Sequence, residues 1–390
     1  MSKRDLSNYQ VETRLGLAGR DPARQDGAVN PPLHRASTLI LDDTDLLYRG
    51  KNKTYALEGM AVQDALKQAL LAVEGGAGAV LAPSGLAACS LALLTIAEAG
   101  GEILVTDSVY GPTRRLCDTM LKRLGVVTRY FDPRIGAGIA ELITDKTCGV
   151  FLESPGSLTF EVQDVPAIIA AARAKGVPVL IDNTWSAGMY FKPFAHGADL
   201  SIQALTKYQA GHADAFLGAV LCATPRWEER VRNAYKQLGL NASPDDAYLV
   251  LRGMRTMAVR LERQSASALK IAQWLEQRPE ISRVLHPALT SSSDHAIWKR
   301  DFTGASGLFG AILKPAPAAN VKAMFENFAL FSMGFSWGGY ESLAIPVDNF
   351  DRTAAPWRED GVLIRLSIGL EHIDDLIADL EQGLTRLGAS

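Results

Sequence analysis

The sequence predicts an α/β protein with a mostly parallel sheet in a large domain and a smaller α/β domain at the C-terminus. Between about residues 60 and 225, short β-rich runs alternate with helical patterns, which is typical of a parallel sheet covered by helices. After about residue 243 the pattern changes to a long helical segment, shorter strands and a final helix. The chain has 390 residues. This exceeds the usual size of one hydrophobic core, so we expect two domains.

The first 59 residues differ from the rest of the chain. They contain two consecutive prolines, Pro31 and Pro32, and show little hydrophobic periodicity. We therefore expect residues 1–59 to form an arm that becomes ordered only against another surface. Residues 1–20 carry charges throughout and lack the apolar region of a secretory signal, so the cytoplasm is the expected location.

The large domain, expected over residues 60–243, begins with an uncharged stretch. Residues 75–97 are long enough to span a bilayer. The sequence Pro83-Ser84-Gly85 interrupts them, so we interpret them as a strand at 79–81, a tight turn and a buried helix at 86–97. Further strands are expected at 102–107, 127–132, 148–154, 177–184, 199–206 and 216–223.

One helix of this domain has clear signals at both ends. Between the strands at 148–154 and 177–184, Asp164 suits the N-cap, Pro166 the first turn and Gly176 the position just beyond the end. The sequence therefore predicts a helix that connects two neighbouring parallel strands.

The small domain is expected over residues 244–390. It opens with a long helical segment at 245–276 and closes with an amphipathic helix. Apolar residues recur at helical spacing in that last helix and predict a stripe that faces the core: Ile373, Leu376, Ile377, Leu380, Leu384 and Leu387.

Composition narrows the classes of function. Apolar residues make up 47% and charged residues 21%, and the net charge is −3, which is too balanced for a broad nucleic-acid or membrane surface. The cysteines form no CxxC pair, which favours buried free thiols in a reducing compartment. The histidines are dispersed, so we expect no metal, and we interpret His212 as a structural hydrogen-bonding residue.

Three strand ends carry the residues that predict chemistry. The strand at 177–184 delivers Asp182, the strand at 199–206 leads to Lys207, and the turn at Gly85 opens a helix. In open α/β sheets, ligands bind beyond the carboxyl ends of the strands. A lysine, an acid and an anion site are what pyridoxal phosphate (PLP) needs for its aldehyde, its ring nitrogen and its phosphate. Each feature alone is more often a surface lysine, a capping acid or a simple turn.

The segment around the lysine carries a family resemblance. Residues 203–214 read Gln-Ala-Leu-Thr-Lys-Tyr-Gln-Ala-Gly-His-Ala-Asp, which resembles the cofactor-lysine signature of the transsulfuration (Cys/Met metabolism) enzymes. These PLP-dependent enzymes have the aspartate-aminotransferase-like fold. The resemblance, which extends from about Tyr55 to the C-terminus, implies that Lys207 links to the cofactor and acts as the catalytic base, and that Asp182 pairs with the ring nitrogen.

The same resemblance implies roles for other residues. Tyr110 would stack on the ring and Tyr55 would reach the phosphate of a neighbouring subunit. Either tyrosine would take a proton from the substrate ammonium. The amides of Gly85 and Leu86 and the hydroxyl of Thr206 would complete the phosphate site.

Substrate recognition is implied further along the chain. Arg365, in Leu-Ile-Arg-Leu-Ser, resembles the arginine that the family uses for the substrate carboxylate, a task that suits its planar fork. Ser336 and Trp337 lie in a loop expected to line the substrate site, which Glu341 and Ser342 complete. The tryptophan at position 337 resembles the residue that the β-lyase branch of the family carries there.

Two residues depart from the family pattern at the phosphate. Leu57 stands where a phosphate-binding arginine is common, and Ala204 stands where a serine is frequent. A lost hydrogen bond to a charged group forgoes about 1.5–3 kcal/mol. Either the cofactor is held less tightly, or another cation compensates, with Arg49, Lys51 and Lys53 as candidates.

The resemblance implies a homotetramer built from two dimers, and a reaction that converts cystathionine to homocysteine, pyruvate and ammonia. A lyase for cysteine S-conjugates or S-alkylcysteine sulfoxides on the same scaffold is an alternative. A nucleotide-binding dehydrogenase is less favoured because Gly76-Ala77-Gly78 lacks the third glycine of GxGxxG. A regulator that retains the fold without catalysis is also less favoured, since the residues implied in catalysis are present.

Overall fold

The larger of two sheets forms the centre of the protein. The computed structural model describes residues 6, 8–48, 53–348 and 350–388. Within them, seven strands lie in the spatial order β1-β7-β6-β5-β4-β2-β3. Strand β7 is antiparallel to both of its neighbours, and the other pairs are parallel. The predicted mostly parallel sheet is therefore confirmed. Its strands are β1 (Gly78–Ala82), β2 (Glu102–Thr106), β3 (Val127–Phe131), β4 (Thr147–Glu153), β5 (Val179–Asp182), β6 (Leu200–Gln203) and β7 (Gly218–Cys222).

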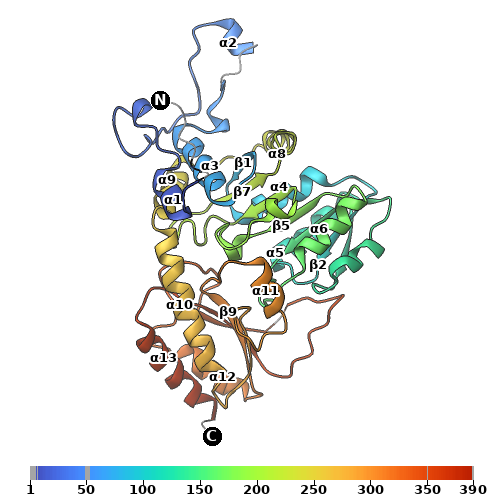
Figure 1. Ribbon diagram of the computed structural model, residues 1–390, viewed down its shortest axis with the longest axis vertical. Coiled ribbons are helices and arrows are strands. Elements are labelled where there is room, and N and C mark those ends of the chain that lie inside the picture. Colours follow the sequence, from blue (N-terminus) through green and yellow to red (C-terminus); the bar gives the residue numbers. More distant parts are fainter. Residues whose placement is uncertain (1–5, 7, 49–52, 349, 389–390) are drawn as a thin grey trace.

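Helices cover both faces of this sheet (Figure 1). Alternate residues of one strand point to opposite faces, and in β1 Val80 packs into the core beneath α4 and α8, whereas Leu81 packs into the core beneath α3 and α9. Both faces must be apolar, which explains the uninterrupted apolar strand sequences. The helices of this part of the chain are α3 (Ala61–Glu74), α4 (Gly85–Ile96), α5 (Gly111–Leu116), α6 (Val165–Ala174), α7 (Pro193–His196) and α8 (Pro225–Gln237).

The predicted end signals of α6 are confirmed. The side chain of Asp164 accepts a hydrogen bond from the amide of Ala167 at 3.2 Å, and Pro166 lies in the first turn. Gly176 follows the helix with a φ of +72°, in the left-handed region that glycine adopts without strain.

A second sheet forms the core of the C-terminal part. Its strands lie in the order β10-β11-β9-β8, and all pairs are antiparallel. The predicted apolar stripe of the last helix is confirmed, because Leu376, Leu380, Leu384 and Leu387 are buried against this sheet. The elements are β8 (Ile281–Leu285), β9 (Leu308–Leu313), β10 (Leu343–Val347), β11 (Leu363–Ser367), α11 (His295–Asp301), α12 (Ala318–Glu326) and α13 (Ile373–Thr385).

The helical segment predicted at 245–276 is in fact two helices, α9 (Pro244–Met254) and α10 (Met257–Leu275). The break follows from the surroundings of Gly253. Its carbonyl accepts hydrogen bonds from Arg260 Nη2 at 2.8 Å and from the amide of Thr256 at 3.1 Å. A Cβ on Gly253 would lie 2.2 Å from the carbonyl oxygen of Ala210. The first helix therefore ends where it packs against the segment that follows Lys207.

The N-terminal segment extends away from the rest of the chain (Figure 1). Helix α1 (Val11–Leu17) packs against α3 with Leu15 buried, whereas α2 (Thr44–Tyr48) lies at the far end of the extension. Ile40 is 85% exposed and Tyr48 81% exposed. The extension thus presents apolar side chains to its surroundings.

Short helical turns complete the described chain. The 3₁₀ turns are η1 (Pro22–Arg24), η2 (Ala56–Glu58), η4 (Gly136–Glu141), η5 (Thr184–Ser186) and η6 (Arg386–Gly388), and the π-helical turn η3 (Cys117–Leu121) continues α5. The uncharged stretch at 75–97 forms the predicted strand β1 and buried helix α4. No helix among the described residues is long and apolar enough to cross a membrane. The four cysteines are free thiols, and all but Cys148 are fully buried.

Candidate active site

The ends of adjacent parallel strands bring the candidate residues together. Strand β5 ends at Asp182, and β6 leads through a short turn to Lys207. Strand β4 ends at Glu153, which lies opposite Asp182 in the ladder. Tyr110 follows β2 and stands at the N-cap of α5. Because these strands are parallel, their carboxyl ends meet at one edge of the sheet, as the sequence predicted for Asp182 and Lys207.

Lys207 reaches from this edge toward the C-terminal domain. Its Nζ donates a hydrogen bond to Ser336 Oγ at 3.0 Å and lies 5.1 Å from the centroid of the Trp337 ring. Burial and, to a smaller extent, the positive charge of Arg365 lower the pKa of Lys207, and Asp182 opposes them; the net effect is a pKa of about 8. A substantial fraction of this amine is therefore neutral near physiological pH and available as a nucleophile or base.

Asp182 is a buried carboxylate that lacks a cation at hydrogen-bond distance among the described residues. Oδ1 accepts hydrogen bonds from the amide and the hydroxyl of Thr184, at 3.0 and 2.5 Å, and Oδ2 accepts a long one from the Cys89 thiol, at 3.6 Å. Burial raises the pKa of Asp182. A protonated ring nitrogen at Oδ2 would supply the missing positive partner, so Asp182 fits the predicted cofactor.

Tyr110 is anchored by Glu153. Its backbone amide donates a hydrogen bond to Glu153 Oε2 at 2.6 Å, and its ring is 44% exposed at the edge of the sheet. Burial raises the pKa of Tyr110, and burial together with the charge of Asp182 raises the pKa of Glu153 well above its usual value.

Sequence reasoning assigned no role to Glu153 or Cys89. Glu153 could have been found by the strand-end argument that identified Asp182, because it ends the neighbouring strand. Cys89 lies inside α4, where the sequence shows only an apolar helix. Nothing local distinguishes its thiol from the other buried thiols.

The predicted phosphate site lies at the start of α4. Gly85 and Leu86 are its first residues, and helix N-termini offer free amides to anions. A Cβ on Gly85 would lie 2.5 Å from the Cβ of Ala204, so this end of α4 is pressed against the turn that leads to Lys207. The hydroxyl of Thr206 accepts a hydrogen bond from the amide of Leu217 at 3.0 Å, which leaves its own proton for an anion or for the Leu217 carbonyl.

The segment around Leu57 offers little positive charge to replace the phosphate-binding arginine of the family pattern. Leu57 packs against the core beneath α4 and α8, and Glu58 pairs with Lys236 at 3.0 Å. Lys53 Nζ bonds to Asp64 Oδ2 at 2.5 Å and to the carbonyl of Gly59 at 2.6 Å. Its charge is thus already neutralised. The other two candidate cations, Arg49 and Lys51, lie outside the described residues.

Arg365 lies buried on β11 and holds the loop that faces Lys207. Its Nη2 donates to the carbonyls of Gly334, Phe335 and Ser336 at 2.9, 2.9 and 3.0 Å. Burial lowers the pKa of Arg365 to about 10, and its Nε is buried without a partner among the described residues. A guanidinium with an unused donor beside Lys207 suits a planar carboxylate ligand.

Hydrogen bonds to Glu371 and ring packing against Tyr208 hold the rest of that loop in place. The Ser342 hydroxyl donates to Glu371 Oε2, and its amide donates to Glu371 Oε1, both at 2.8 Å. The ring of Trp337 packs against Tyr208, with 5.4 Å between the centroids. Ser342 thus supports the loop, whereas Ser336 and Trp337 approach Lys207.

Tyr55 is not brought to the other predicted residues within this single chain. It is 53% exposed and forms an isolated antiparallel bridge with Thr38. No hydrogen bond of the described residues joins it to Lys207, Asp182 or Tyr110.

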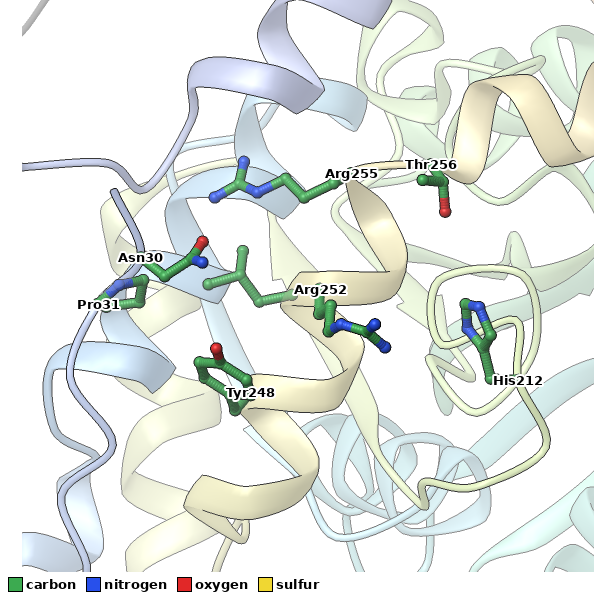
Figure 2. Close-up of a pocket in the computed structure, with 8 residues that line it drawn as sticks. Asn30, Pro31, His212, Tyr248, Arg252, Arg255 and Thr256 are labelled. Carbon is green, nitrogen blue, oxygen red and sulfur yellow. The ribbon is translucent and has the colours of Figure 1, made fainter. Parts of the chain in front are cut away.

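A hollow of about 280 Å³ lies between the N-terminal arm and the junction of α9 and α10 (Figure 2). None of the predicted site residues lines it. Of its lining residues, His212 lies within the lysine signature, and its Nδ1 lies 2.7 Å from the carbonyl oxygen of Ala210, as the structural interpretation of this residue expects. No group of three or more metal-ligating side chains occurs among the described residues.

Comparisons with known proteins cover nearly the whole chain. A family model described as "Cys/Met metabolism PLP-dependent enzyme" matches residues 12–385. Cystathionine beta-lyase MetC of Escherichia coli (strain K12) is 45% identical, over 98% of this chain and 100% of that protein. Cystathionine beta-lyase of Salmonella typhimurium (strain LT2) is 43% identical with the same coverage. The crystal structure of cystathionine gamma synthase from Xanthomonas oryzae pv. oryzae is 30% identical, with a TM-score of 0.88 over 97% of this chain and 98% of that one.

Proposed function

The chain belongs to the family of Cys/Met metabolism PLP-dependent enzymes, and we propose that it is a carbon–sulfur β-lyase that converts cystathionine to homocysteine, pyruvate and ammonia. Two relatives named as cystathionine beta-lyases, matched over almost their full length, support this reaction. The observation that carries the proposal is the half-buried amine of Lys207, which donates to Ser336 and has a lowered pKa that the charges of Arg365 and Asp182 influence in opposite directions. Family membership also removes the dehydrogenase interpretation.

The residues at the edge of the sheet fit PLP. Asp182 would pair with the ring nitrogen, Tyr110 would lie against the ring, and Lys207 would hold the aldehyde carbon. The amides of Gly85 and Leu86 at the helix start, with the hydroxyl of Thr206, would hold the phosphate. When bound, PLP supplies an electron sink for the electron pair that remains when the substrate α-carbon loses its proton.

The chain's own side chains then divide the work. Arg365 orients the substrate carboxylate, and Ser336 positions the Nζ of Lys207. Once the substrate amine has displaced Lys207 from the aldehyde carbon, the neutral amine of Lys207 removes the proton from the α-carbon, and the β-thiolate leaves and takes up a proton. Water then hydrolyses the remaining three-carbon enamine to pyruvate and ammonia. A tyrosine accepts a proton from the substrate ammonium. Burial raises the pKa of Tyr110, which disfavours its phenolate as the acceptor; Tyr55 of a second copy is the other candidate for this step.

We assign residues 1–59 to an arm that serves the neighbouring subunit, 60–243 to the cofactor domain and 244–390 to the small domain. The exposed apolar residues of the arm support docking on a second copy, and a tetramer of two such dimers is the proposed assembly. Mixing a Tyr55→Phe protein with a Lys207→Ala protein tests the sharing of sites. Activity above the sum of the two proteins is expected from hybrid dimers, and no gain under conditions of subunit exchange would contradict it. The free cysteines support a cytoplasmic location.

A β-lyase for S-alkylcysteines or cysteine S-conjugates is the second candidate. The packing of Leu57 and the pairing of Glu58 with Lys236 favour it, because this segment presents no guanidinium as the family pattern would. Measuring kcat/KM for cystathionine and for S-methylcysteine separates the two. A higher kcat/KM for S-methylcysteine than for cystathionine would identify S-alkylcysteines as the substrates instead.

The cofactor assignment has a direct test. The purified protein should show a visible absorption band, and borohydride reduction should fix the cofactor on Lys207, as peptide mapping can establish. A cofactor fixed on another lysine, or no visible band after PLP is added, would refute the site. A Lys207→Arg protein treated in the same way is the matched control, since it keeps the charge and should carry no adduct.

A further inference from the structure

A buried carboxylate, that of Glu74, contacts the end of β5, which carries Asp182, and β6, which leads to Lys207. Glu74 is the last residue of α3, the first helix after the arm. Its Oε1 accepts hydrogen bonds from Asn183 Nδ2 at 2.9 Å and from the Ser201 hydroxyl, and its Oε2 accepts one from Gln203 Nε2 at 2.6 Å. One side chain of α3 thus joins the ends of β5 and β6.

These contacts continue to both functional residues. Asn183 directly follows Asp182 in the chain, and Gln203 lies four residues before Lys207. The Oε1 of Gln203 accepts a hydrogen bond from Gln209 Nε2 at 2.9 Å, two residues beyond Lys207. Asn183 beside Asp182, and Gln203 and Gln209 on either side of Lys207, are therefore linked by hydrogen bonds to Glu74.

The direction of every hydrogen bond in this network depends on the acid. A carboxylate only accepts, so Asn183 and Gln203 must both turn their NH₂ groups toward it. Their oxygens are then fixed on the other side, where Asn183 Oδ1 accepts from the Ser186 hydroxyl at 2.6 Å and Gln203 Oε1 accepts from Gln209. A neutral amide at position 74 would face one of these NH₂ groups with its own NH₂.

The surroundings accommodate a charge at this position. Lys192 lies nearby, with its Nζ bonded to the carbonyls of Val73 and Gly188 at 2.5 Å each. A Cβ on Gly188 would lie 2.7 Å from Glu74 Oε2, so glycine leaves room for the acid. Burial raises the pKa of Glu74, and the three hydrogen bonds and Lys192 oppose this effect.

We propose that Glu74 is a positioning residue, whose acceptor-only carboxylate sets the direction of the amide hydrogen bonds and thereby the placement of Asp182 and Lys207. The inference rests on the proposed function, since its effect appears at the cofactor that these two residues hold. It does not depend on which thioether is the substrate.

Three variants test the proposal. Glu74→Gln keeps the shape of the side chain and replaces one acceptor oxygen by an NH₂ donor. Ser201→Ala removes a hydrogen bond to the same carboxylate without reversing any. Glu74→Gln combined with Gln203→Glu exchanges acid and amide, so that the new amide accepts from Asn183 and donates to position 203, where the new acid still accepts from Gln209. This exchange places an acid near the carbonyl of Asn183, to which Gln203 Nε2 also donates at 3.2 Å, so we expect a partial rescue.

The measurements are the dissociation constant of PLP from the apo-protein, the pH midpoint of the visible band, kcat/KM and thermal unfolding. A buried donor left without an acceptor costs enough to change an equilibrium about tenfold or more. Glu74→Gln should raise the PLP dissociation constant and lower kcat/KM by about this factor and shift the midpoint. Ser201→Ala should stay within about threefold of the wild-type protein, and the double variant should recover at least part of the loss.

The outcomes are distinguishable. If Glu74→Gln lowers only the unfolding temperature, while the PLP dissociation constant and the midpoint stay unchanged, Glu74 is structural and the proposal is overturned. An equal loss in the double variant would overturn it too. Should Glu74→Gln not fold, Gln209→Met is measured instead, because it removes the next hydrogen bond of the same network, the one that Gln203 Oε1 accepts. It must change the same quantities in the same direction, and no change refutes the proposal. A wild-type protein that binds PLP but cleaves no thioether contradicts only the proposed reaction.

Discussion

The lowered pKa of Lys207 predicts how fast the apo-protein captures PLP at each pH. Only the neutral amine attacks an aldehyde, and the pKa of Lys207 is lowered from 10.5 to about 8. At pH 7 this difference of 2.5 units gives roughly 300-fold more neutral amine than an ordinary lysine has. The capture rate should therefore rise with pH, reach half of its maximum near pH 8 and level off above it.

Substitutions of neighbouring charges should move this midpoint in opposite directions. Removing the positive charge in Arg365→Met should raise it by roughly one pH unit, because a like charge no longer disfavours the ammonium. Asp182→Asn should lower it, because the carboxylate stabilises the ammonium. Arg365→Lys is the matched control, since it keeps the charge while losing the fork, and its midpoint should remain near that of the wild-type protein.

The assay is stopped-flow absorbance at the visible band after apo-protein is mixed with PLP across a pH series. The same series with Nα-acetyl-lysine in place of the protein corrects for the titration of PLP itself. A wild-type midpoint near 10, or the same midpoint for Arg365→Met and the wild-type protein, would show that the electrostatic reasoning about Lys207 is wrong.

Three further predictions concern the cofactor and the fold. Asp182→Asn should weaken PLP binding by about 10- to 100-fold, the value of a hydrogen bond to a charged group, as equilibrium titration can measure. Gly85→Ala should push α4 away from Ala204, weaken PLP binding and lower the free energy of unfolding by about 1–3 kcal/mol. Adding Ala204→Gly should restore both PLP binding and stability. If it restores neither, the contact between positions 85 and 204 is not the cause. Asp164→Ala should cost about 1 kcal/mol in chemical denaturation through loss of the α6 N-cap, and Asp164→Asn should cost less.

The sequence predicted what local patterns determine. Strand ends follow from short apolar runs and the turns behind them, which is why Asp182 and Lys207 could be placed at one edge of the sheet before their distances were known. The ends of α6 were predictable for the same reason, because caps are chosen by the side chains that fill them. The lysine signature then turned a weak strand-end pattern into a cofactor assignment.

Features that depend on distant segments were not predictable. The end of α9 is set by the close approach of Gly253 to Ala210 and by the hydrogen bond from Arg260. In the sequence that stretch reads as continuous helix. Glu74 looks like an ordinary last residue of an amphipathic helix, and only the ends of β5 and β6 give its carboxylate three donors.

Leu57 and Ala204, the two departures from the family pattern, both affect how the phosphate of PLP can be held. Leu57 packs in the core and Lys53 is paired with Asp64, so neither of these two residues offers a free cation for the phosphate. Among the described residues, the groups proposed to hold the anion are then the amides at the start of α4 and the hydroxyl of Thr206, and the contact of Gly85 with Ala204 sets how closely this helix start approaches the turn that leads to Lys207. A serine at 204 would add an atom at this tight contact. The alanine therefore gives up a hydrogen bond but lets the helix start approach closely, so cofactor affinity in this chain should depend on helix placement more than on side-chain charge.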